Sequence, residues 1–259
     1  MSTAAGKEEA VQGTVARLNE FGVALLPEFI DEVSELQGES QQALQAFEID
    51  RRQTASSDRP QEKNLSPDLS ETKTGCQLKL TNNRQFRESY PAMARVFRCE
   101  FMREVADLVL GTPNSLNRHV VLTHDFRPAD ETFPFHFDEM NALKFYIYLT
   151  NAGTGTATLE VIPGTQAEGR FIRMSEWHRV DDFRAIRNRV FDEFSEEYFY
   201  NVFRRFKAVV RMDAVALGGP PGTLVIFNTD CLHRGGPLSS GEQRMVIRGS
   251  TYAGFWGAG

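Results

Sequence analysis

The chain contains the stretch Thr132-Phe133-Pro134-Phe135-His136-Phe137-Asp138 and, shortly after it, Leu143-Lys144-Phe145-Tyr146-Ile147-Tyr148-Leu149. Both stretches are rich in aromatic and β-branched residues, which favour β-strands over helices. In the second stretch, a lysine and two tyrosines alternate with apolar residues, so these three side chains share one face of the predicted strand. We therefore expect two neighbouring strands here, with His136 and Asp138 on the first.

Further stretches of the same character make the chain mainly β from about Leu116 onward. They are Val120-Val121-Leu122-Thr123, Leu159-Glu160-Val161-Ile162, Thr223-Leu224-Val225-Ile226-Phe227-Asn228 and Gln243-Arg244-Met245-Val246-Ile247-Arg248-Gly249-Ser250-Thr251-Tyr252. No internal repeat accompanies them. The pattern predicts a core built from many short strands.

The N-terminal part of the chain has helical periodicity instead. Apolar residues recur at spacings of three and four over residues 8–20, from about Asp31 onward and over Tyr90–Leu110, which is the pattern of amphipathic helices. Gly22 to Leu26 predicts a short strand, and the polar segment 51–75 predicts a long loop. We expect one domain over residues 1–259, with residues 1–7 frayed.

His136, Asp138 and His233 form a possible set of metal ligands. Side chains at positions i and i+2 of a strand point to the same face, so His136 and Asp138 can bind one ion while Phe137 points away. Two imidazoles and one carboxylate are the facial triad of mononuclear non-haem iron sites, which leaves positions open for a chelating 2-oxo acid and for O2. A His-x-Asp pair alone is a weak signal, so its flanking strands carry much of the interpretation.

Several features together resemble the phytanoyl-CoA dioxygenase-like family of Fe(II)/2-oxoglutarate oxygenases. They are residues 20–30, His136-Phe137-Asp138, Leu159-Glu160-Val161-Ile162-Pro163-Gly164-Thr165, His233-Arg234-Gly235-Gly236 and Arg244. The resemblance covers about residues 14–253. It implies a double-stranded β-helix (jelly-roll) core buttressed by N-terminal helices, with Fe(II) bound by His136, Asp138 and His233. It also implies that Arg244 binds the distal carboxylate of 2-oxoglutarate.

Arg248 is an alternative to Arg244 as the residue that binds 2-oxoglutarate. Arg248-Gly249-Ser250 is similar to an Arg-x-Ser motif in other branches of the superfamily, and Arg244, Arg248 and Ser250 share one face of the predicted strand. A guanidinium can bind a carboxylate through two parallel hydrogen bonds, and a serine can add a third donor. Thr123 is a further candidate for contact with the co-substrate. The resemblance favours Arg244, because its spacing from His233 fits the closer family, although either arginine can instead form a structural ion pair.

Residues 165–211 interrupt the strands with a helical pattern that carries more basic than acidic residues. One interpretation is a lid over the mouth of the barrel, in which Arg170 and Arg173 contribute positive charge toward an acidic substrate. The other interpretation is a helix packed outside the barrel with a solvated face. Asn141 and Lys144, close to the ligand pair in sequence, are additional candidates for substrate contact.

Composition limits the partners and the compartment. The formal net charge of −6 argues against binding to nucleic acid or to an anionic membrane surface. The three cysteines are widely spaced, which indicates a reducing compartment without a disulfide framework. We expect no signal peptide and no membrane span, because the start lacks an apolar core and no apolar run approaches about 20 residues. The prediction is a soluble, cytoplasmic protein with a small-molecule substrate; its oligomeric state stays open.

The residues and the resemblance together predict a dioxygenase that converts 2-oxoglutarate and O2 to succinate and CO2 while hydroxylating a C–H bond. Asp138 stands where halogenating relatives have Ala or Gly, so hydroxylation, desaturation or ring closure is favoured over halogenation. The expected substrate is a small metabolite or a natural-product intermediate. Two alternatives stay open: an oxygenase that acts on a macromolecule, and a non-catalytic jelly-roll binding protein with a vestigial site.

Overall fold

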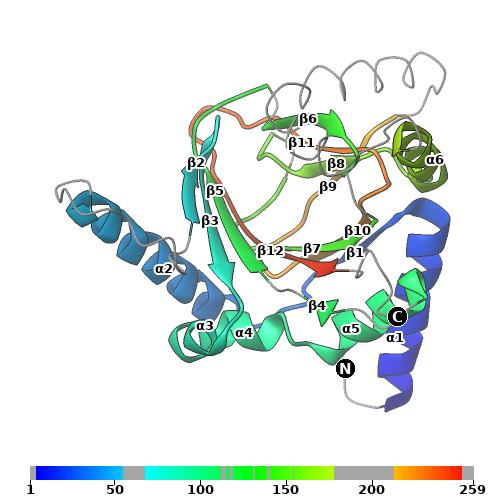
Figure 1. Ribbon diagram of the computed structural model, residues 1–259, viewed down its shortest axis with the longest axis horizontal. Helices are drawn as coiled ribbons and strands as arrows, with labels where there is room; N and C mark the ends of the chain where they lie inside the picture. Colours follow the sequence, from blue (N-terminus) through cyan, green and yellow to red (C-terminus); the bar gives the residue numbers. More distant parts are fainter. Residues whose placement is uncertain are drawn as a thin grey trace.

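Two antiparallel sheets face each other at the centre of the molecule, and helices cover one of them (Figure 1). The computed structural model describes residues 4–54, 68–111, 115–116, 119–130, 132–138, 141–153, 155–177 and 213–252. The helices are α1 (Ala4–Phe21), α2 (Val33–Thr54), α3 (Arg84–Ser89), α4 (Pro91–Val96), α5 (Glu100–Leu110) and α6 (Gln166–Trp177). The strands are β1 (Val23–Leu26), β2 (Asp68–Glu71), β3 (Gly75–Thr81), β4 (Ser115–Leu116), β5 (His119–Asp125), β6 (Phe133–His136), β7 (Leu143–Tyr148), β8 (Leu159–Val161), β9 (Val215–Leu217), β10 (Leu224–Asn228), β11 (His233–Gly235) and β12 (Arg244–Tyr252).

Neighbouring strands of both sheets come from distant parts of the chain. The larger sheet has eight strands in the order β1-β10-β7-β12-β5-β3-β2, with β4 paired to β12. The smaller sheet has four strands in the order β6-β11-β8-β9. This pairing of non-consecutive antiparallel strands in two facing sheets is that of a jelly roll. The predicted mainly β fold with N-terminal helices is therefore confirmed.

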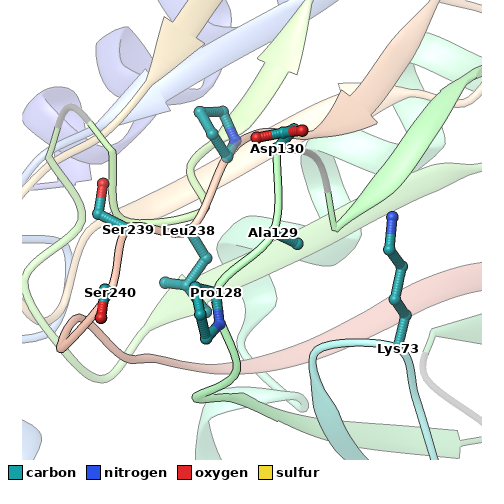
Figure 2. A pocket seen from close by; sticks show the side chains of 8 residues that line it. Lys73, Pro128, Ala129, Asp130, Leu238, Ser239 and Ser240 are labelled. Carbon is teal, nitrogen blue, oxygen red and sulfur yellow. The ribbon is translucent and has the colours of Figure 1, made fainter.

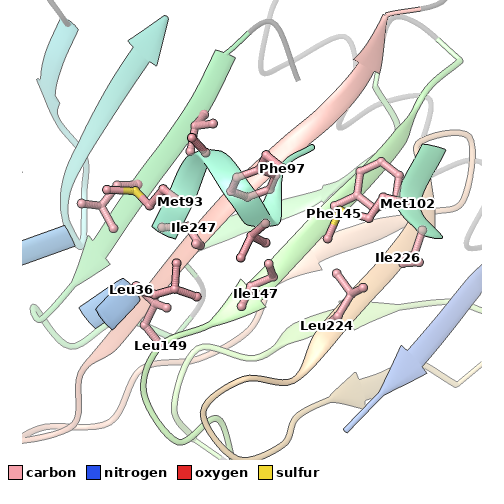
Figure 3. Packing of buried hydrophobic residues seen from close by; sticks show 14 of the residues in the cluster. Leu36, Met93, Phe97, Met102, Phe145, Ile147, Leu149, Leu224, Ile226 and Ile247 are labelled. Carbon is pink, nitrogen blue, oxygen red and sulfur yellow. The ribbon is translucent and has the colours of Figure 1, made fainter. Parts of the chain in front are cut away.

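Strand alternation gives the larger sheet two different apolar faces. On β7, Leu143, Phe145 and Ile147 point to the helices, where they join a cluster with residues of α1 to α5. Tyr146 and Tyr148 point to the other face and pack between the two sheets. Figure 3 shows the helix side of this arrangement, with side chains of three adjacent strands packed against the helical layer. The helices thus bury one face of the sheet, and the other face forms the interior of the barrel.

The helical layer differs from the sequence expectation in three places. The helix expected over Tyr90–Leu110 is divided into α4 and α5, because Cys99 adopts an extended ψ of 128° between them. The segment 51–75, expected to be a loop, includes the end of α2 and also β2, which pairs with β3. The frayed start expected over residues 1–7 is helical from Ala4. Polar composition alone did not reveal β2, because this strand gains its stability from pairing rather than from apolar residues.

The helical insertion expected over residues 165–211 is described only in its first part. That part forms α6, and residues 178–212 lie outside the described residues. Among the described helices, none is both long enough and apolar enough to cross a membrane.

Ile147 provides a test of the packing that supports the sheet. Its side chain is fully buried, and it lies between Leu224 on β10 and Ile247 on β12. We expect Ile147→Ala to lower the free energy of unfolding by about 2–5 kcal/mol, because a cavity remains where the side chain was. The matched Ile147→Val variant should cost only about 0.5–1.5 kcal/mol. Urea denaturation followed by circular dichroism measures both, and equal costs would contradict the proposed packing.

Candidate metal centre

Three side chains converge between the two sheets, at the end of β6 and the beginning of β11. His136 ends β6, His233 begins β11, and the two residues are paired directly across these strands. Their ring centroids lie 4.2 Å apart. The Asp138 Oδ1 atom is 3.6 Å from His136 Nε2 and 3.8 Å from His233 Nε2. All three ligand atoms lie within 4.8 Å of one another, so one metal ion can contact all of them.

Asp138 is positioned by a turn rather than by the strand itself. β6 ends at His136, and the Asp138 backbone N–H donates to the Thr229 carbonyl at 3.0 Å. The Thr229 hydroxyl in turn bonds the backbone N–H and carbonyl of Ala142. Phe137 is buried, at 6% exposure, as expected for the residue between two ligands. The sequence argument placed His136 and Asp138 on one strand; the structure keeps their common direction but places Asp138 just beyond the strand end.

His233 has the protonation geometry of a metal ligand. Its Nδ1 atom lies 2.8 Å from the Cys231 carbonyl oxygen, which accepts only from a protonated nitrogen. The Nε2 atom therefore carries the lone pair, and it has no hydrogen-bond partner in the described part of the chain although the side chain is only 2% exposed. Burial lowers the pKa of His233 well below its usual value, so the ring is neutral. The Nε2 lone pair thus faces the Asp138 carboxylate, and no hydrogen-bond donor of the described residues lies between them. A metal ion can occupy such a position and accept electrons from both groups.

Lys144 orients the carboxylate of Asp138. The Lys144 Nζ atom is 2.7 Å from Asp138 Oδ2, while Oδ1 faces the two histidines. Burial alone raises the pKa of the Asp138 carboxyl, but Lys144, His233 and His136 more than offset this effect, and the pKa lies well below its usual range. The two oxygens can thus serve different partners. Lys144, predicted as a possible substrate contact, is placed by the structure against a ligand of the centre.

The two candidate arginines have different partners. Arg244 donates from Nε and Nη2 to Oδ2 of Asp125 and from Nη1 to the Ala157 carbonyl. Arg248 donates from Nη1 to the Tyr146 hydroxyl at 2.9 Å and from Nη2 to Gln77 Oε1 at 2.6 Å. Sequence reasoning missed Asp125, Tyr146 and Gln77. Only the alternation of Lys144 with Tyr146 along β7 could have indicated one of them, since the other two depend on strand register.

The remaining predicted site residues are Thr123, Asn141, Ser250 and Arg173. Thr123 is buried, and its hydroxyl has no partner within the described residues; the same is true of the side-chain oxygen of Asn141. Ser250 is the cross-strand neighbour of Lys144. The side chain of Arg173 lies outside the described residues. None of these positions has a contact that assigns it a role, so their roles stay predictions.

Helix α6 packs closely on the turn that leads into β11. Gly169 lies so near Asp230 that an added Cβ atom would stand 1.9 Å from the Asp230 carbonyl oxygen. The exposed Arg170 side chain has its Nε atom 3.9 Å from Asp230 Oδ2. Asp230 stands three residues before His233, so α6 packs on the turn that leads to a candidate ligand. Whether Arg170 also contacts a substrate stays a prediction.

A shallow cavity of about 590 Å³ lies elsewhere, among loops (Figure 2). It is lined by Lys73, Pro128, Ala129, Asp130, Pro237, Leu238, Ser239 and Ser240. These loops precede β6 and follow β11, whereas His136 ends β6 and His233 begins β11. The cavity is therefore at the opposite end of these strands from the ligands.

Comparison with known proteins identifies relatives at the level of family and fold. Residues 18–246 match the family described as phytanoyl-CoA dioxygenase (PhyH), which confirms the resemblance seen in the sequence. Among curated protein sequences, none matches the chain.

Three solved structures illustrate the shared fold. The carbocyclase SnoK from nogalamycin biosynthesis superposes with a TM-score of 0.62 at 13% identity, covering 95% of this chain and 85% of that one. The epimerase SnoN from the same biosynthesis gives 0.57 at 14% identity, covering 95% and 83%. EctD from S. alaskensis with bound Fe gives 0.58 at 18% identity, covering 92% and 75%. At these identities the likeness is one of fold.

Gly169 tests the packing of α6 on the turn before β11. Alanine normally favours a helix over glycine by about 1 kcal/mol, but at Gly169 the added methyl group would collide with the Asp230 backbone. We expect Gly169→Ala to destabilise the protein and to weaken metal binding. The matched Gly13→Ala variant, where nothing lies within 4 Å, should stabilise α1 by up to about 1 kcal/mol. Thermal unfolding compares the two, and the same sign for both would contradict this packing.

Cys231 is predicted to be an unreactive thiol although it lies two residues before His233. Its side chain is fully buried, with Sγ 3.2 Å from the Ile162 carbonyl oxygen and 3.5 Å from the Thr165 hydroxyl. Burial raises the pKa of the thiol, and only the thiolate reacts. In native protein at pH 8, iodoacetamide should therefore leave Cys231 unmodified until denaturant is added, as peptide mass spectrometry can show. Rapid native labelling at this position would place the thiol in an open cavity.

Proposed function

We propose that this chain, which belongs to the phytanoyl-CoA dioxygenase (PhyH) family, is an Fe(II)- and 2-oxoglutarate-dependent oxygenase that oxidises a C–H bond of a small metabolite. The observation that carries the proposal is the buried Nε2 atom of His233, which has no donor within the described residues and faces Asp138 and His136. A buried acceptor without a partner is costly unless a ligand completes it. This feature supports a working site more than a vestigial one.

Iron fits the donor set that the chain offers. Two imidazole nitrogens and one carboxylate oxygen are the facial triad of non-haem iron(II) oxygenases, whereas structural zinc sites favour thiolates and a closed tetrahedron. Cys231, the nearest thiol in sequence, is bonded to the Ile162 carbonyl and not directed at the cluster. When bound together, Fe(II) and 2-oxoglutarate activate O2 for attack on a C–H bond, with release of succinate and CO2.

The chain itself holds and shields these groups. The Cys231 carbonyl fixes the tautomer of His233, and Lys144 holds Asp138 through Oδ2 so that Oδ1 stays on the histidine side. The Phe227 ring lies 4.8 Å from the His233 ring and is fully buried. This apolar wall excludes water from one side of the centre, which strengthens every charge interaction there.

Hydroxylation of a small molecule is the reaction that we favour. The Asp138 carboxylate occupies the ligand position that halogenation would need for a halide. Related structures carry the names of a carbocyclase and an epimerase. Ring closure, in which the substrate loses two hydrogen atoms, is a second outcome of the same C–H oxidation. These names support a small-molecule substrate over a macromolecular one, and the acidic net charge of −6 argues against nucleic acid.

The proposal is tested by anaerobic titration of metal-free protein with Fe(II) and then with 2-oxoglutarate. We expect one equivalent of iron to bind and a weak visible charge-transfer band to develop as the 2-oxo acid chelates it. His136→Ala should abolish the band, because it removes one of three ligands, and Cys99→Ser serves as the unrelated control. Addition of O2 should release succinate slowly even without substrate. Iron that does not bind to the wild-type protein would refute the function.

A further inference from the structure

Lys144 is held against the Asp138 carboxylate by its place on a central strand. β7 lies between β10 and β12 in the larger sheet, and Lys144 is the cross-strand neighbour of Phe227 on one side and of Ser250 on the other. Its Nζ atom is 2.7 Å from Asp138 Oδ2 and 5.9 Å from the centroid of the Phe227 ring. A strand that is paired on both sides opens rarely, so the ammonium group stays beside this carboxylate.

The two oxygens of Asp138 have different surroundings. Oδ1 lies 3.6 Å from His136 Nε2 and 3.8 Å from His233 Nε2, whereas Oδ2 contacts Lys144. The backbone of Asp138 is fixed by the hydrogen bond from its N–H to the Thr229 carbonyl, so only rotation of the side chain could turn both oxygens toward the histidines. Such a rotation would break the contact with Lys144. Lys144 therefore reserves Oδ2 and leaves Oδ1 on the histidine side.

Lys144 also compensates the charge of a mostly buried carboxylate. The side chains of Lys144 and Asp138 are only 22% and 23% exposed. Arg248 also acts electrostatically on Asp138, but its own hydrogen bonds go to the Tyr146 hydroxyl and the Gln77 side-chain oxygen. Among the lysines and arginines that the structure describes, Lys144 is thus the one in contact with Asp138. Its removal would deprive the carboxylate of its closest cation, which is costly for a buried charge.

The contact between Lys144 and Oδ2 has two opposite consequences for a metal held by His136, Asp138 and His233. The positive charge of Lys144 repels a divalent ion, and an Oδ2 atom bound to Lys144 is not available as a second carboxylate ligand. Both effects weaken metal binding. Three protein ligands leave positions open for a chelating 2-oxo acid and for O2, however, and a carboxylate that bound through both oxygens would occupy one of them. The same contact therefore keeps a position open.

We propose that Lys144 is a positioning residue that acts as a resident counter-ion of Asp138. In the metal-free protein, Lys144 compensates the carboxylate and stabilises the empty centre. In the loaded protein, it keeps Oδ2 away from the metal, so that one coordination position stays open at the expense of metal affinity. This role rests on the proposed function, since it requires a metal at the centre.

The test compares Lys144→Met, which keeps the length of the side chain without its charge, with Lys144→Arg, which keeps a cationic donor. Binding of Co(II) to metal-free protein is measured by calorimetry. Lys144→Met should bind Co(II) about tenfold more tightly than the wild type, because a like charge is removed and Oδ2 is released. Lys144→Arg should stay within about threefold of the wild type, because arginine also donates to a carboxylate. Lys79→Met, at an exposed lysine on β3, is the matched control and should change nothing.

Thermal unfolding separates this role from a merely structural one. A ligand that binds more tightly to a variant also stabilises its fold by more, so the gain in affinity and the loss of metal-free stability are coupled. Metal-free Lys144→Met should therefore unfold at a lower temperature than the metal-free wild type, and saturating Co(II) should remove most of the difference. A structural role of Lys144 would leave the difference in place.

Nitric oxide, which binds iron(II) where O2 would, reports on the open position. With Fe(II) and 2-oxoglutarate bound, the wild type and Lys144→Arg should give the electron paramagnetic resonance signal of a nitrosyl complex. Lys144→Met should lose most of this signal, because Asp138 can then offer both oxygens to the metal. Succinate formation is not needed for this measurement.

The outcomes are distinct. Unchanged or weaker Co(II) binding in Lys144→Met, or an unfolding temperature that Co(II) does not restore, would overturn the inference. If Lys144→Met does not fold without metal, Lys144→Gln replaces it, and this neutral polar variant should also bind Co(II) more tightly than the wild type; equal or weaker binding there would overturn the inference as well. A wild-type protein that binds neither Fe(II) nor Co(II) would refute the proposed function itself.

Discussion

The register between β6 and β11 is the constraint on which the candidate centre depends. His136 and His233 are partners across these strands, and a slip by one residue would turn one ring to the opposite face of the sheet. Strand β11 is only three residues long, but it is paired on both sides, with His233 opposite Val161 on β8. The Thr229 carbonyl then fixes Asp138 against the turn that leads into β11. Backbone pairing thus brings the three candidate ligands together, and the Lys144 side chain orients the Asp138 carboxylate.

The two faces of the larger sheet have different roles: one packs on the helices, and the other carries the charged residues near the candidate centre. Its outer face is apolar and packs on α1 to α5, which supplies most of the buried core. Its inner face carries the polar residues, and each of two cations there has a carboxylate partner: Lys144 with Asp138, and Arg244 with Asp125. Arg248 is bonded only to neutral groups within the described residues. The inner face thus holds the candidate centre and its charged neighbours, while the outer face packs against most of the buried core.

The sequence was sufficient to predict most of the strands, the helical buttress and the clustering of His136, Asp138 and His233, because these depend on local alternation and on spacing along the chain. It was not sufficient to predict the partners of the ligands. Arg244 and Arg248 could each be recognised as polar residues on an inward face, but Asp125 and Gln77 become their partners only through the register of β5, β3 and β12. The resemblance favoured Arg244 over Arg248 by its spacing from His233, but the spacing carried no information on the partners of either arginine. The candidate substrate residues beyond α6 depend on residues 178–212, outside the described part, and stay predictions.

Arg244 and Arg248 differ in the partners that surround their buried guanidinium groups. Arg244 and Asp125 are both buried, and removing one partner from such a pair typically costs about 3–5 kcal/mol, because the other charge is left uncompensated. Arg248 is hydrogen-bonded instead to the Tyr146 hydroxyl and to the Gln77 side-chain oxygen. The same strand thus presents one guanidinium paired with a buried carboxylate and one that is hydrogen-bonded to neutral groups among the described residues.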